Sequence, residues 1–180
     1  RFSAGAISAV GLLVCAAGLF WLSGCAPGTP RAGMVWPLLL IGAGIGLPWG
    51  LMDGLAVSVV PRERAGMASG IFNTVRVAGE GIALALVGAG LTALVTAQLG
   101  HAAAASQAAQ RVTTGNLSQA LALLPGIDRA GLLHAYGAAF GTLLYVLAGV
   151  TVLTAIVVFA FLRGETHAEA GAVALESTAC

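Results

Sequence analysis

Four long apolar runs, separated by short polar or proline-rich breaks, dominate the sequence. A helix of about 20 apolar residues crosses a bilayer core about 30 Å thick. Pro27 and Pro30 interrupt the chain after the first run and Pro61 after the second, because proline cannot continue a helix interior. The runs predict membrane-spanning helices at about 2–23, 34–60, 65–99 and 136–162. We therefore predict an all-α membrane protein, a helical bundle with about four transmembrane helices.

The third predicted helix is longer than a bilayer requires. Its strictly apolar part, 81–97, is short for a span, and extension back past Glu80 and Arg76 gives more than enough length. We expect its N-terminal end to project from the membrane.

A polar, alanine-rich stretch at 100–135 separates the third and fourth helices. Its segment AAAASQAAQR is rich in helix formers, and Asn116 is placed to cap NLSQALALL. The tail after Arg163 is acidic and rich in small residues, a composition typical of disorder. The prediction is a membrane domain at 1–163 followed by a disordered tail at 164–180.

The composition also indicates that lipid surrounds part of the protein. Of the residues, 58% are hydrophobic and 8% charged, whereas soluble domains carry about 25% charged residues. A net charge of +1, with no basic stripe to neutralise phosphates, argues against nucleic acid as a partner. The three cysteines form no CxxC or Cys/His cluster, so neither a metal site nor a cofactor is expected.

The ends of the chain suggest a fragment of a longer, multi-pass protein. Arg1 rather than Met opens the sequence, and no charged region precedes a short apolar run with a cleavage site, so a signal peptide is a poor explanation. Four spans place both ends on one side. That side would hold four arginines, all close to helix ends, and the other side three, two of them in the longer loop. This distribution favours a cytoplasmic C-terminus and an extracytoplasmic 100–135 loop.

The second predicted helix carries glycines at every fourth position, Gly42, Gly46, Gly50 and Gly54. This spacing places them on one helix face, where another backbone can approach closely. Pro48 should loosen or kink the helix locally. The face is interpreted as a tight helix–helix contact, and a bending point in a moving helix that lines a path is a compatible alternative.

Asp53 is an ionisable residue deep in the same helix. About eight residues separate it from Pro61, which places it roughly 12 Å from the turn at 1.5 Å per residue. An ionisable group at such a depth marks a functional site or a buried partner. Three interpretations stay open: a role in proton or substrate binding, a structural ion pair or hydrogen bond to Arg76 or Asn73, and a position in the wet interface.

Arg76 and Glu80 are four residues apart and so share a face of the third helix. One interpretation is a local ion pair that makes both residues tolerable near lipid. The other is that Glu80 takes up and releases a proton during transport.

An enzyme is not expected. The segment GMASG, 66–70, resembles the GxSG turn of rhomboid-like intramembrane serine proteases, but Met67 stands where that motif needs glycine. Nothing links Ser69 to His134, and no catalytic residue is assigned.

The stretch from Leu38 to Val95 resembles a known family. A glycine-rich span (LLLIGAGIGLPWG) precedes a proline–charge–glycine turn (PRERAGMASG), which is followed by an Asn-x-x-Arg from Asn73 to Arg76. This order is similar to the last part of the fourteen-helix drug:proton antiporter branch of the major facilitator superfamily. Glu80 departs from the pattern, since that segment is usually uncharged.

The resemblance implies helices eleven to fourteen of a multidrug efflux transporter in a bacterial cytoplasmic membrane. Such a protein exports small hydrophobic or amphipathic compounds against an influx of protons by alternating access. Its partners would be the lipid bilayer, the missing N-terminal transporter helices, substrate and protons. Two alternatives stay open: a metabolite permease of the same superfamily, and a self-contained four-helix membrane scaffold protein.

Overall fold

The computed structural model describes residues 4–25, 30–58, 60–100 and 103–178, without the side chains of residues 4, 31, 51–53, 55–58, 103 and 161–178. Its helices are α1 (Ala4–Ser23), α2 (Arg31–Ser58), α3 (Ala65–Leu99), α4 (Ala103–Thr113), α5 (Leu117–Leu123) and α6 (Arg129–Thr178), with a short 3-10 helix, η1, at Arg62–Arg64. The described residues contain no strand.

Four of these helices are long and apolar enough to cross a membrane. Their spans are Gly5–Ser23, Ala32–Gly50, Arg62–Leu99 and Arg129–Ala160. The chain is thus an all-α, multi-pass membrane protein, and the predicted fold class is confirmed.

The last helix differs most from its expected bounds. α6 begins at Arg129 rather than near 136, and the Asp128 carboxylate accepts a hydrogen bond of 2.9 Å from the Gly131 backbone N–H, as a residue that caps a helix N-terminus does. The expected disordered tail at 164–180 is instead helical as far as Thr178. Alanine and glutamate in the tail are strong helix formers, and extension of an existing helix requires no new nucleus.

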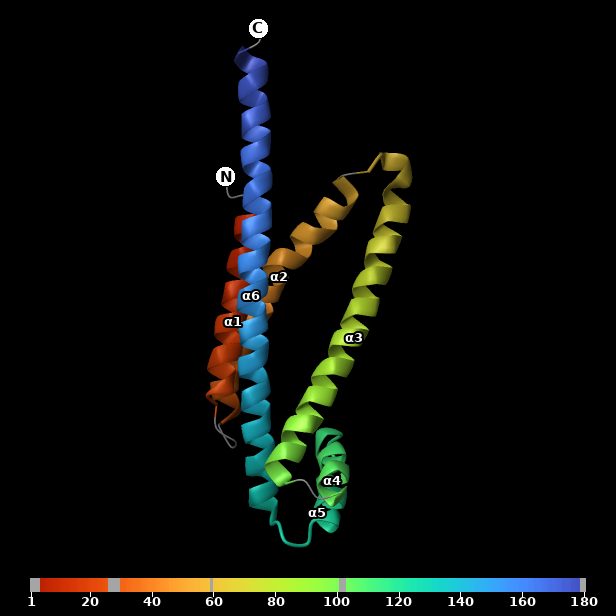
Figure 1. Cartoon of the computed structure of the whole chain (residues 1–180), viewed down its shortest axis with the longest axis vertical. Coiled ribbons are helices and arrows are strands. Elements are labelled where there is room, and N and C mark those ends of the chain that lie inside the picture. The colour runs from red at the N-terminus through yellow and green to blue at the C-terminus, as the bar shows by residue number, and fades with distance from the viewer. Residues whose placement is uncertain (1–3, 26–29, 59, 101–102, 179–180) are drawn as a thin grey trace.

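The long helices form a packed group of three and a fourth that diverges from it. α1 packs along both α2 and α6. α3 leans away from α1 and α6 toward its N-terminal end, where the C-terminal part of α2 slants outward to meet it (Figure 1). Short helices α4 and α5 lie beside the C-terminal end of α3. In the most apolar stretch of α1, 39% of the residues are buried, against 6% in α3.

Glycines bring α1 and α2 into backbone contact. A Cβ added at Gly44 would lie 2.6 Å from the Gly11 carbonyl oxygen and would collide with the Cys15 backbone nitrogen. A Cβ at Gly18 would lie 2.9 Å from the Pro37 carbonyl oxygen. These distances are shorter than van der Waals contact, so the helices approach this closely only because the three positions lack side chains.

The predicted glycine face does not make this contact. A Cβ added at Gly42, Gly46, Gly50 or Gly54 meets no atom within 4 Å in the described part of the chain. The contact between α1 and α2 instead runs through Gly44, which lies off the four-residue line. A four-residue period identifies positions that share a face, but it does not say which face the neighbouring helix covers.

We expect Gly44→Ala to destabilise the packing of α1 on α2, whereas Gly149→Ala in α6, where an added Cβ meets nothing within 4 Å, should not. Both substitutions replace a helical glycine, so both gain the same helix propensity, and only the first inserts a methyl group between two backbones. Overpacking of this kind costs about 1–3 kcal/mol. Thermal unfolding in detergent, followed by circular dichroism, measures the difference, and equal midpoints for the two variants would contradict the contact.

Candidate functional site

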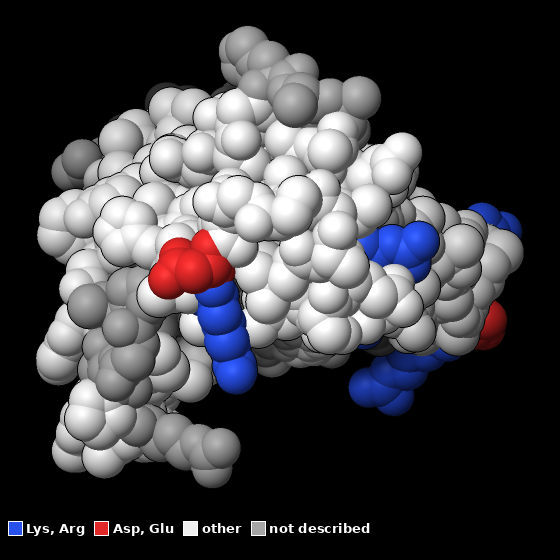
Figure 2. Space-filling model, turned by 90° about the horizontal axis from the view of Figure 1, so that it is seen from below, with Lys and Arg blue, Asp and Glu red and all other residues white. Residues whose placement is uncertain are grey.

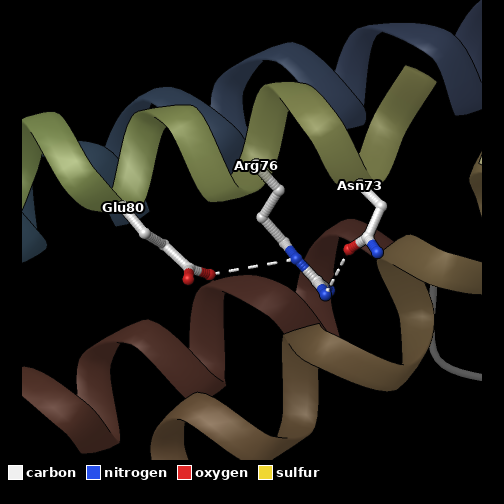
Figure 3. Close-up of polar contacts among 3 residues, drawn as sticks. All are labelled: Asn73, Arg76 and Glu80. Carbon is white, nitrogen blue, oxygen red and sulfur yellow. Dashed lines mark hydrogen bonds and ion pairs between the residues drawn. The ribbon is translucent and has the colours of Figure 1, made fainter. Parts of the chain in front are cut away.

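A cluster of polar side chains lies on one face of α3. The Arg76 guanidinium donates a hydrogen bond of 2.7 Å from Nη2 to Asn73 Oδ1, and its Nε lies 3.8 Å from Glu80 Oε1. All three side chains point from α3 toward α1 and α2 (Figure 3). The structure therefore brings together three of the candidate residues that the sequence indicated.

The helix itself sets this arrangement. Residues three and four apart on a helix are neighbours on its surface, so Asn73 and Glu80 lie on either side of Arg76 along the same face. A charge in an apolar environment is costly unless partners meet it. The amide supplies a neutral acceptor, and the carboxylate supplies an opposite charge that is about half exposed.

Two aromatic rings cover the same guanidinium. The Arg76 Cζ atom lies 4.7 Å from the centroid of the Trp49 ring in α2 and 6.0 Å from the Phe72 ring in α3. Cation–π contacts at such distances contribute about 0.5–2 kcal/mol, with the larger values at desolvated sites. Trp49 belongs to another helix, so this contact joins α2 to α3.

The guanidinium forms part of the wall of a cavity of about 250 Å³ where α1, α2, α3 and α6 meet. Most of the wall is apolar, and Trp49 and Phe72 supply its aromatic part. Ser8, which is buried, and Thr154 add hydroxyl groups. Arg76 is the charged residue of the lining, whose members are Ser8, Leu12, Ile45, Pro48, Trp49, Phe72, Arg76, Thr154 and Val158.

The remaining candidate residues lie in α2. Pro48 contributes to the cavity wall, and the helix continues through it. Asp53 follows Trp49 by one helical turn, but its side chain lies outside the described residues. The proposed pairing of Asp53 with Arg76 or Asn73 stays a prediction.

Sequence reasoning missed Trp49, Ser8 and Thr154 as parts of the site. Trp49 directly follows Pro48 and lies one turn before Asp53, and a large aromatic residue next to a proline and an acid in a membrane helix is a usable signal. Ser8 and Thr154 carry no such signal. Their place in the site depends on how α1 and α6 pack against α2.

Few charged side chains lie on the face of the molecule that carries α4 and α5. Seen from the end where α4 and α5 lie, the molecule shows a few charged side chains, among them an acidic one beside a basic one, on a mainly uncharged surface (Figure 2). Among the described residues, no group of three or more His, Cys, Asp or Glu side chains is placed to hold a metal ion. In the described part of the chain, the cluster around Arg76 combines charge, aromatic rings and a cavity.

The chain is similar to a known transporter. It is 41% identical over 88 residues to the uncharacterized transporter YebQ of Escherichia coli (strain K12). The match covers 48% of this chain and 19% of the length of that relative. No family model matches the chain, and no solved structure matches it. The similarity and the four spans together support a role in transport.

The contact between Trp49 and Arg76 can be measured with a double-mutant cycle. Trp49→Leu and Arg76→Gln should show a coupling of about 0.5–2 kcal/mol in the free energy of unfolding, because each variant removes one side of the cation–π pair. Trp36 is exposed and lies outside the cavity, so the matched cycle of Trp36→Leu with Arg76→Gln should show none. Equal coupling in the two cycles would show that Trp49 has no special relation to Arg76.

Proposed function

We propose that this chain forms the C-terminal part of a secondary transporter that exports small amphipathic compounds in exchange for protons by alternating access. The observation that carries the proposal is the cavity between four membrane helices, with one guanidinium and two aromatic rings in its wall. Transporter binding sites typically lie between helices inside the membrane domain. Polar and ionisable groups there mark substrate and proton pathways.

The chemistry of the cavity suits amphipathic compounds. Its apolar and aromatic side chains bind rings and hydrocarbon by burial, and its two hydroxyl groups and guanidinium offer hydrogen bonds. Its volume of about 250 Å³ lies below the roughly 300–1,000 Å³ that is usual for a drug-sized ligand. A substrate of that size would therefore also contact helices outside this chain.

The same cluster offers a route to proton coupling. Glu80 is a carboxylate beside the guanidinium, and its protonation would remove the negative charge that faces Arg76. The guanidinium would then change partners, which is a local charge event of the kind that shifts a conformational equilibrium. Asp53, one turn from Trp49, is the second carboxylate proposed for this role.

Two helices are proposed to meet the remainder of the transporter. α2 presents the glycine face, where an added Cβ meets nothing within 4 Å. α3 exposes large apolar side chains over most of its length: Met67, Ile71, Val75, Val77, Ile82, Leu84 and Leu86. Close-packing glycines on α2 and a charged cluster on α3 suit contact with protein better than contact with acyl chains. The proposed partners on this side are the N-terminal transporter helices, and lipid covers α1 and α6.

The proposal also includes the orientation of the chain in the membrane and the direction of transport. The C-terminus is placed in the cytoplasm and the α4–α5 segment outside the cytoplasmic membrane, as the arginine distribution favours. A permease that imports a metabolite is the second candidate, and the sign of the proton flux distinguishes it from an exporter. The similarity to a transporter favours either over a self-contained four-helix scaffold.

Two carboxylate variants of the full-length protein test proton coupling. Asp53→Asn and Glu80→Gln keep side-chain size and remove the ionisable group, so each should lower proton-driven efflux several-fold at unchanged protein level. Glu63→Gln, at an exposed position in η1, should leave efflux unchanged. Efflux of a fluorescent amphipathic dye from energised cells, normalised to the amount of protein in the membrane, gives the rates.

Unchanged efflux in both Asp53→Asn and Glu80→Gln would contradict a coupling role and leave these residues structural. A dye gradient that forms in the opposite direction would favour the permease.

A further inference from the structure

Many of the fully buried residues in the described part of the chain lie at the end that was expected to be a loop. Ala108 and Val112 of α4, Ala120 of α5 and Leu132 of α6 form one buried cluster. Val95 of α3, Ala109 of α4 and Ala139 of α6 form a second. Leu99 and Tyr136 pack against both clusters. We call these two clusters together the loop core.

The loop core joins four consecutive helices, α3, α4, α5 and the first turns of α6. α4 turns back along α3, so that the Thr113 hydroxyl lies 3.4 Å from the Thr92 hydroxyl. Thr92 lies seven residues before the end of α3 at Leu99, which places Thr113 about 10 Å back along that helix. Gly100, with φ of 96°, allows the abrupt reversal after α3, since other residues rarely adopt positive φ.

Among the side chains that the structure describes, no buried cluster lies at the opposite end of α3. Met67 and Val75 are 62% and 68% exposed, and Figure 1 shows this end of α3 farthest from α1 and α6. The contact of Arg76 with Trp49 crosses from α3 to α2 near this end. α3 is therefore held at its C-terminal end by close packing, and toward its other end the Arg76–Trp49 contact joins it to α2.

We propose that the loop core is a rigid pivot, about which α3 swings relative to α6 to open and close the cavity beside Arg76. Close-packed cores resist gradual deformation, so a movement of α3 is confined to the end that lacks a core. Ala108, Ala109 and Ala120 let the backbones of α4 and α5 lie close to their neighbours. The proposal rests on the transport function proposed above, because the swing of α3 is assigned a role in transport.

A reversible disulfide tests the pivot directly. Thr92→Cys and Thr113→Cys, introduced together in a cysteine-free background of the full-length protein, place two thiols where the hydroxyls are 3.4 Å apart. Because the pivot does not move, efflux of the fluorescent dye in the oxidised state should match efflux in the reduced state. A several-fold loss on oxidation that reductant reverses would overturn the proposal, and so would failure of the disulfide to form.

A second variant tests whether efflux requires a rigid loop core. Ala109→Leu overpacks the loop core and should lower efflux several-fold, and the Thr92→Cys/Thr113→Cys disulfide should restore it. The control is Gln107→Leu, at an exposed position in the same helix, which should have no effect. Full efflux in Ala109→Leu, or a loss that the disulfide does not restore, would contradict the pivot.

A distance measurement separates this inference from the proposed function. Spin labels at Met67 and Val157 report the free end of α3 against α6, and labels at Gln98 and Leu133 report the end at the loop core. Pulsed electron paramagnetic resonance in nanodiscs should give a broad distribution for the first pair and a narrow one for the second. Equal widths would overturn the pivot whether or not the protein transports dye, whereas the predicted widths without dye transport would count against the transport proposal alone.

Discussion

A charged guanidinium within a membrane helix is costly unless hydrogen-bond acceptors, an opposite charge or aromatic rings lie beside it. The site consists of Arg76 and the residues that meet this need. Arg76 lies in a helix of mainly apolar and small residues, where an unmet charge is costly. Asn73 and Glu80 meet it from the same helix, and Trp49 covers it from α2. The two partners on α3 need only helical spacing. The third partner, Trp49, requires α2 to lie close to α3. The position of α2 therefore determines how well the Trp49 ring covers the guanidinium.

The packing of α1, α2 and α6 surrounds the contact between Arg76 and Trp49. α1, α2 and α6 form a close group, in which Gly11, Gly18 and Gly44 bring two backbones together. α3 joins this group at the loop core and at the Trp49 contact. Between these two attachments the helix is largely exposed. The cavity lies next to the weaker attachment, which is the place where a small movement changes its walls most.

The sequence predicts the membrane helices well because bilayer thickness fixes their length and apolar composition. It also predicts that Asn73, Arg76 and Glu80 share a face, because local spacing on one helix decides this. It does not predict Trp49 as a partner or Gly44 as the contact with α1, because these depend on how the helices are rotated against one another. The sequence does not predict the packing of the loop core for a similar reason. Alanine-rich segments such as α4 indicate a helix, but they do not indicate what the helix packs against.

The central claim is that the side of the molecule formed by α2 and α3, with Arg76 and its cavity, faces the interior of a transporter. Electron cryomicroscopy of the full-length protein in lipid nanodiscs tests it most directly, since the map shows what covers each helix. The account predicts protein density against the glycine face of α2 and an Arg76 guanidinium at the wall of an internal cavity, in contact with Trp49. A map in which lipid covers both the glycine face and Arg76, with α1 and α6 turned toward the interior, would contradict it.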